Sequence, residues 1–176
     1  LLLSGIPLQS IAFLFGGVTE LELALSFIIL LVTAIALGTV GIYFSAALPR
    51  TLIASVRSYS VILGAMFVAP VVLSAILNVI NELLFSSAGA VVSPVMETIL
   101  RYVDLLLTSV NPIAAGLAAQ DILVNQRMLG FYSYTLRSDG STIPMVSPWI
   151  TFAIIYLAIS AVLVVLTIRH TKQSVN

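Results

Sequence analysis

The chain of 176 residues has no cysteine, one histidine and only 8% charged residues. Without cysteine it cannot form a disulfide, a reactive thiolate or a cysteine metal site. One histidine cannot build a histidine-based metal cluster. A soluble domain carries roughly a quarter charged residues, so this composition excludes a surface that faces water throughout. The formal net charge is zero, which gives no argument for a nucleic-acid partner.

Sequence motifs for catalysis are lacking as well. The only lysine is Lys172, and no G-x-x-x-x-G-K-[ST] sequence occurs, so the chain has no phosphate-binding loop for ATP. His170 lies beside this lysine, and a hydrolase would need it to meet a serine and an orienting acid. Because the acids are expected on the other side of a membrane, we interpret His170 as a solvated tail residue. We therefore expect no enzymatic activity, no cofactor and no metal ion in this chain.

Hydrophobic residues make up 60% of the chain and are concentrated in long runs without charge. The run 23–49 has 27 residues, or about 40 Å of helix, and the run 58–81 has 24. Both can cross a hydrocarbon core of about 30 Å, as can the run that starts near residue 148 and ends at Arg169. Residues 1–15 predict the outer part of a further span, and we expect the chain to be a fragment. The predicted fold is an all-α integral membrane protein with about four transmembrane helices, the first truncated.

Basic and acidic residues are segregated along the chain. Arg50 and Arg57 lie in one short polar break, and Arg169 and Lys172 lie in another; neither break contains an acid. Membrane insertion retains Lys and Arg on the cytoplasmic side. We therefore expect a multi-pass cell-membrane protein with residues 48–57 and the C-terminus in the cytoplasm. Arg50 and Arg57 are topology markers first and candidate contacts for a cytoplasmic partner second.

Residues 82–146 differ from the rest and predict an extracytoplasmic insertion before the last span. They hold five acids and three arginines, and their apolar runs are too short to span. The stretch 94–110 has helical spacing, with Glu97, Arg101 and Asp104 on one face, which predicts a helix at the membrane interface. We interpret the three charges as a water-facing ion-pair stripe first, and as contacts for a polar substrate on an exit path second.

The second half of this insertion predicts another short helix and a hairpin. Asn111 and Pro112 have the pattern of an N-cap and a first helical residue, opening a helix to about Arg127. Residues 131–145 predict a small hairpin, although Pro144 weakens its second strand. The aromatic residues expected at the outer headgroup layer are Tyr132, Tyr134 and Trp149.

Three polar or kinking residues in the run 58–81 are candidates for a gate. Pro70 lies near its middle, where it deletes one backbone hydrogen bond and should kink the helix. A static kink is the first interpretation and a hinge the second. Asn78 and Asn81 approach the outer end of this run. They are interpreted as helix termination and interfacial hydrogen bonding before a role in a translocation path.

The start and the middle of the run 23–49 carry local signals. Thr19 and Glu22 have the spacing of a capping box, in which each side chain bonds the other residue's backbone N–H. Gly38 and Gly41 lie near one side of the predicted helix, where a neighbouring helix can approach closely. We expect this side to serve packing within the subunit rather than a dimer seam.

The order of these features resembles the C-terminal part of ABC transporter permeases of the second type, the exporter-like membrane subunits. The resemblance covers nearly the whole chain through short motifs, and its last element is the basic tail. The matching residues are Pro7, Gly16 and Gly17 at the first span, Ser45, Arg50 and Ala54 in SAALPRTLIA, Asn111 and Pro112 in SVNPIAAGLAA, and Arg169 and Lys172.

The resemblance implies a single permease domain over residues 1–176 that exports an unidentified substrate. It also implies a second permease subunit, identical or different, and two ATP-binding cassette ATPase subunits that bind ATP. The family's N-terminal amphipathic helix, its first two spans and its coupling helix would precede Leu1. A membrane scaffold or assembly subunit without a transport path is the alternative. An ion-coupled carrier is a third option, disfavoured because uncharged spans offer no ion relay.

Overall fold

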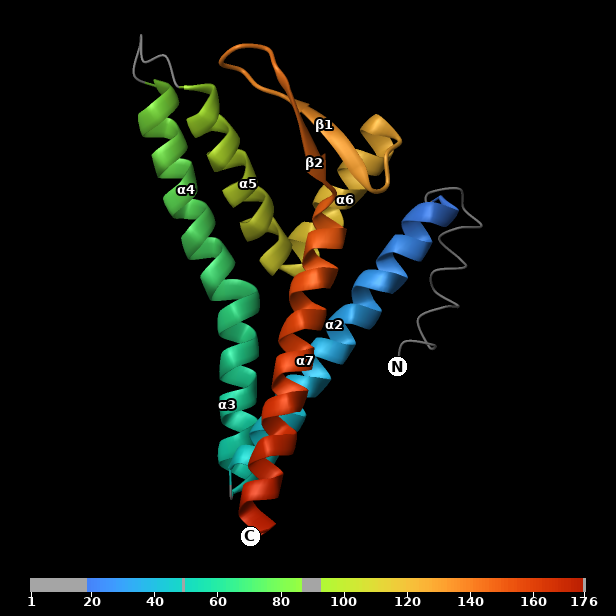
Figure 1. Cartoon of the computed structure of the whole chain (residues 1–176), viewed down its shortest axis with the longest axis vertical. Helices are drawn as coiled ribbons and strands as arrows, with labels where there is room; N and C mark the ends of the chain where they lie inside the picture. Colours follow the sequence, from blue (N-terminus) through green and yellow to red (C-terminus); the bar gives the residue numbers. More distant parts are fainter. Residues whose placement is uncertain (1–18, 49, 87–92, 176) are drawn as a thin grey trace. The chain divides into compact units, whose positions relative to one another are not determined.

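A computed structural model of the chain describes residues 19–48, 50–86 and 93–175, and these residues are mainly helical (Figure 1). The predicted first span, with Pro7, Gly16 and Gly17, lies outside the described residues, as does Pro49. The elements in chain order are α2 (Glu20–Ala47), α3 (Thr51–Leu63), the π-helical segment η2 (Gly64–Val68), α4 (Ala69–Ser86), α5 (Pro94–Val110), α6 (Pro112–Gln126), β1 (Phe131–Thr135), β2 (Thr142–Val146) and α7 (Pro148–Val175).

Three of the described helical stretches are long and apolar enough to cross a membrane: Glu20–Ala47, Thr51–Ile80 and Pro148–Lys172. Most of their apolar side chains are exposed in the isolated chain, for example Val71 at 66% and Ile154 at 64%. Helices that are apolar on nearly every side need lipid or protein around them, because water would solvate them poorly. The chain is therefore a mainly helical, membrane-associated protein.

The chain divides into two compact units. One contains the residues up to Ser60 together with those from Ala153 onward, and the other contains Val61–Phe152. In the first unit, α2 opens with the predicted capping box. Thr19 Oγ1 accepts from Glu22 N at 3.3 Å, and a Glu22 carboxylate oxygen accepts from Thr19 N at 2.7 Å. This prediction is confirmed.

The helix that follows the first basic break begins earlier than predicted. α3 starts at Thr51, so Arg57 lies inside a helix and only Arg50 lies in the break. Arginine is a good helix former, so a single charge does not end a helix whose neighbours continue the pattern. Both arginines are exposed. The helix therefore begins before the predicted span, and the point at which the span enters the membrane stays a prediction.

In the second unit, α5 and α6 have the bounds that the sequence predicted, with Asn111 as the N-cap between them. α5 packs against both α4 and α6, and in Figure 1 it returns alongside α4. α6 ends where Arg127 adopts the left-handed conformation, with φ 54°. These two short helices lie in the chain between α4 and α7, where an insertion before the last span was predicted.

The β1–β2 hairpin follows α6 and is closed by a hydrogen bond from Ser147 N to Gly130 O at 2.8 Å. A second one runs from Leu136 N to Ser141 O at 2.8 Å. Hydrogen-bonded pairs alternate along an antiparallel ladder, so Pro144, which faces Ser133, occupies a non-hydrogen-bonded position. The strand therefore loses no ladder bond to this proline, and the expected weakening does not apply.

Candidate functional site

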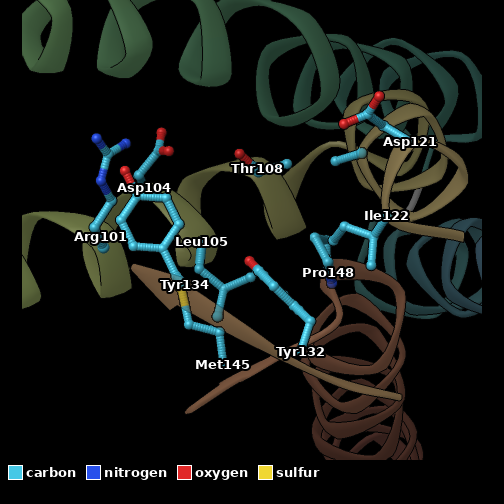
Figure 2. Close-up of a pocket in the computed structure, with 11 residues that line it drawn as sticks. Arg101, Asp104, Leu105, Thr108, Asp121, Ile122, Tyr132, Tyr134, Met145 and Pro148 are labelled. Carbon is cyan, nitrogen blue, oxygen red and sulfur yellow. The ribbon is translucent and has the colours of Figure 1, made fainter. Parts of the chain in front are cut away.

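The second unit contains a cleft of about 200 Å³ between its two short helices, its hairpin and the start of α7 (Figure 2). Figure 2 shows Arg101 and Asp104 at one end of it and Asp121 at the other. The lining residues are Arg101, Asp104, Leu105 and Thr108 of α5, Ala118, Asp121 and Ile122 of α6, Tyr132 and Tyr134 of β1, Met145 of β2, and Pro148 of α7.

The strand register explains why two tyrosines meet in this cleft. Tyr132 and Tyr134 are two residues apart on β1, so they lie on the same face of the hairpin, and Met145 is the cross-strand partner of Tyr132. That face is half-buried, whereas the side chain of Phe131 is 71% exposed and lies on the opposite face. The tyrosines therefore line the cleft, and their place at the outer headgroup layer stays a prediction.

Arg101 is held by an aromatic ring rather than by a neighbouring acid of its helix. Its guanidinium carbon lies 4.7 Å from the centroid of the Tyr134 ring. A cation over an aromatic face is stabilised electrostatically, and stacking leaves the N–H groups at the edge of the guanidinium available to other acceptors. Asp104 is exposed at the same end of the cleft.

The phenol of Tyr132 is the half-buried polar group near the middle of the cleft. Burial raises the pKa of Tyr132, and the negative charge of Asp104 adds to the rise. The group therefore stays protonated around neutral pH and can donate a hydrogen bond. At the far end, Asp121 accepts a hydrogen bond from Asn125 Nδ2 at 2.7 Å, which leaves the rest of its acceptor capacity free for a ligand.

Hydrogen bonds between distant segments hold the walls of the cleft in place. Tyr102 donates from its hydroxyl to Pro144 O at 2.8 Å, which joins α5 to β2. Ser109 is fully buried and donates to Leu105 O at 2.7 Å and to Pro148 O at 3.2 Å. These bonds fix α5 against the hairpin and the start of α7, so the position of Arg101 and Asp104 relative to the two tyrosines is set by the fold.

The prediction that Glu97 faces water, in a stripe with Arg101 and Asp104, is wrong. Its side chain is 0% exposed, and its two carboxylate oxygens accept from Arg137 N at 2.9 Å and Ser138 N at 3.0 Å. Burial raises the pKa of a carboxyl, but the hydrogen bonds from Arg137 and Ser138 and the positive charge of Arg101 outweigh it. They hold the pKa of Glu97 below its ordinary value. Glu97 therefore anchors the hairpin turn to α5, and of the three predicted charges only Arg101 and Asp104 line the cleft.

Asn111, at the junction of the two short helices, binds a backbone carbonyl in the turn before Pro70. A proline has no N–H, so the carbonyl four residues before Pro70, that of Met66, loses its α-helical partner. Asn111 Nδ2 donates to Met66 O at 2.9 Å, while Asn111 Oδ1 accepts from Ile113 N at 2.8 Å and Ala114 N at 3.3 Å. The π-helical segment η2 directly precedes this proline region. Asn111 thus caps α6 and satisfies the carbonyl that Pro70 leaves open.

Of the two asparagines among the gate candidates, only Asn78 has a described side chain, and it does not line the cleft. Asn78 is exposed on α4 and is not among the lining residues, and nothing is described of the side chain of Asn81. The sequence did not predict that Asp121, Thr108 and Tyr132 form a site, and it predicted Asn111 only as an N-cap. The available signal was the combination of tyrosines two residues apart with acids on both short helices, although no local pattern joins these segments.

The structure contains no group of three or more His, Cys, Asp or Glu residues suited to a metal ion within the described part of the chain. Comparison with models of protein families, with curated proteins and with solved structures finds no match. The function therefore has to be argued from the chain's own residues.

Proposed function

We propose that the chain is the membrane-spanning permease subunit of an ATP-driven exporter, located in the cell membrane with residues 48–57 and the C-terminus in the cytoplasm. The observation that carries the proposal is the order of the elements. A small-residue-rich apolar helix, a basic break, a proline-interrupted span, two short helices joined by Asn111-Pro112 and a last span with a basic tail follow one another. The same order underlies the resemblance to exporter-like ABC permeases.

The segregation of charge supports this orientation. Arg50 and Arg57 are exposed close to the first break, and Arg169 and Lys172 are exposed at the end of α7. All acids lie elsewhere in the chain. Positively charged residues are retained in the cytoplasm during insertion, so the cleft and the hairpin would lie on the outer side.

The contact between Asn111 and Met66 supports a deeper position for the two short helices than the flat interfacial one expected from their sequence. Met66 lies near the middle of the candidate span Thr51–Ile80. If that span crosses the bilayer, the α5–α6 junction reaches about mid-depth, where non-helical backbone is tolerated only when protein groups satisfy it. Asn111 supplies such groups.

The position of Arg101 is consistent with this arrangement. Arg101 precedes the junction by ten residues of helix, which corresponds to about 15 Å. Half of a hydrocarbon core of about 30 Å has the same thickness, so Arg101 and the cleft would lie near the outer headgroups. The exposed apolar side chains of α5, such as Ile99 and Leu106, would face lipid or a partner helix.

The proposal assigns ATP to separate ATP-binding cassette subunits, since the chain has no phosphate-binding loop. Arg50 and Arg57 are the candidate contacts on the cytoplasmic side. A second permease subunit completes the transporter. Gly38 and Gly41 of α2 line a hollow with Thr167 and Thr171 of α7, and no atom of the described residues lies within 4 Å of a Cβ built on either glycine. This space is compatible with a further helix, from this chain or from another subunit.

A scaffold or assembly subunit is the competing function. It would need apolar helices for packing. It would need neither a cleft with charged and hydroxyl groups nor the hydrogen bond from Asn111 to Met66 O in the proline-interrupted span. The cleft lined by Arg101, Asp104 and Tyr132 therefore favours transport.

The test is to recover the tagged chain from its native membrane in mild detergent after chemical crosslinking. We expect an ATPase subunit with a phosphate-binding loop to co-purify, and ATP hydrolysis by the complex to be lost when the loop lysine of that subunit is replaced. Recovery of the crosslinked chain with no such subunit would contradict the proposal of ATP-driven transport and favour the scaffold function.

A further inference from the structure

The cleft of the second unit has a guanidinium beside a carboxylate at one end and a second carboxylate at the other. Arg101 is at one end and Asp121 at the other, on different helices (Figure 2). Asp104 lies beside Arg101, so the lining carries two carboxylates and one guanidinium. A purely anionic ligand would meet an excess of negative charge, and a purely cationic one would meet Arg101. A ligand with both charges complements the two ends.

We propose that this cleft binds a small zwitterionic group, with a primary ammonium at Asp121 and a phosphate or carboxylate at Arg101. The guanidinium presents a planar fork of donors that matches either anion. Tyr132 and Thr108 lie between the ends and offer hydroxyl groups to the ligand's remaining oxygens. Leu105 and Met145, both buried, give an apolar floor for a short hydrocarbon linker.

The aromatic lining selects a primary over a quaternary ammonium. Quaternary ammonium groups are recognised by open aromatic faces. Arg101 already occupies a face of the Tyr134 ring at 4.7 Å. A carboxylate such as Asp121 instead accepts hydrogen bonds, which a primary ammonium donates and a trimethylated one cannot.

The size of the cleft limits the ligand to a small molecule or to the head of a larger one. Its volume of about 200 Å³ is below the roughly 300–1,000 Å³ of pockets that enclose drug-sized ligands. An ammonium and a phosphate joined by two carbons fit this description. Such a group exists both as a free molecule and as the headgroup of a membrane lipid. This inference concerns the cleft alone and does not rest on ATP-driven transport.

The chain provides its own reporter for binding. Trp149 is the only tryptophan, it follows the lining residue Pro148, and its indole N–H donates to Leu129 O at 2.7 Å. We expect a saturable change in its fluorescence when O-phosphoethanolamine is added to the purified full chain in detergent. Trp149→Phe should remove the signal.

The charged ends are tested by two variants with matched controls. Asp121→Asn and Arg101→Gln should each weaken binding at least about tenfold, because each removes a charge-assisted hydrogen bond. Glu82→Gln and Arg137→Gln replace exposed residues of the same charges outside the cleft and should change binding less than about twofold. Circular dichroism checks that all four variants are folded. Tyr132→Phe keeps the ring and should weaken binding measurably even if a charge variant fails to fold.

The ligand chemistry and its source are tested by competition. Ethanolamine, inorganic phosphate and phosphocholine should each bind at least about tenfold more weakly than O-phosphoethanolamine. Phosphatidylethanolamine added to mixed micelles, against a phosphatidylglycerol control, should displace the free compound if the lipid headgroup is the occupant; no displacement identifies the free zwitterion. Absence of any saturable response to either form, or equal binding by the wild type, Asp121→Asn and Arg101→Gln, would overturn the proposal.

Discussion

Replacing Asn111 by alanine removes three hydrogen bonds, two that cap α6 and one that joins the start of α6 to Met66 O. The N-cap bonds to Ile113 N and Ala114 N contribute about 1 kcal/mol, typical of an Asn-to-Ala change at an N-cap. The bond to Met66 O contributes about 0.5–1.5 kcal/mol more. We therefore expect a loss of about 2 kcal/mol in the free energy of unfolding, measured by titrating dodecyl sulfate into mixed micelles with circular dichroism as readout.

The Met66 contribution is isolated in a Pro70→Ala background. Alanine at position 70 has an N–H that can bond Met66 O, so Asn111 is no longer needed there. Asn111→Ala should then cost only the cap, about 1 kcal/mol, and the coupling between positions 70 and 111 should be about 1 kcal/mol. Asn111→Asp keeps the cap acceptor and loses the donor, so its cost should largely disappear in the Pro70→Ala background. Gln120→Ala, an exposed amide on the same helix, should change stability by less than about 0.5 kcal/mol.

A coupling energy of zero between positions 70 and 111 would refute this reasoning. It would mean that Asn111 stabilises α6 only as a cap and that the contact with Met66 O contributes nothing. The proposed mid-depth position of the α5–α6 junction would then lose its main support.

Three further changes test the anchors of the short helices and of α2. The pKa of Glu97 is lowered in the folded chain, so its ionised form stabilises the hairpin at pH values above the pKa of an unfolded glutamate. This stability is lost as the pH falls through the folded-state pKa. Glu97→Gln should therefore remove about 1–3 kcal/mol at neutral pH and flatten the acid dependence of stability in unfolding experiments. Tyr102→Phe, which removes the bond to Pro144 O, should cost about 1 kcal/mol by the same assay, and an unchanged midpoint would remove this bond from the account. Thr19→Ala should increase amide exchange in the first turn of α2 and cost about 1 kcal/mol; equal exchange would argue against the capping box.

The local features of this fold were predictable from the sequence. The capping box at Thr19, the bounds of α5 and the N-cap at Asn111 depend on residues within four positions of each other, so the pattern that predicts them also contains the interaction. The apolar runs likewise predict helices because hydrophobicity and length act along a single segment.

The tertiary features could not be read in the same way. Glu97 reaches Arg137 and Ser138 across 40 residues, and no charge pattern on its own helix indicates that the hairpin turn would bind its carboxylate. The Asn111–Met66 bond spans 45 residues and depends on a carbonyl opened by Pro70 in another helix. The cleft combines segments of α5, α6 and the hairpin, so its lining appears only when these elements pack together.

Membrane topology is the most direct test of the central claim, that the chain crosses the membrane with the β1–β2 hairpin on the outer side and its basic breaks inside. The chain has no native cysteine, so single cysteines can be placed at Thr51, Thr135 and Thr171, all of which are exposed. In intact cells a membrane-impermeant maleimide should label position 135 alone, and positions 51 and 171 should react only after permeabilisation. Labelling of position 51 or 171 in intact cells, or protection of position 135, would contradict the account.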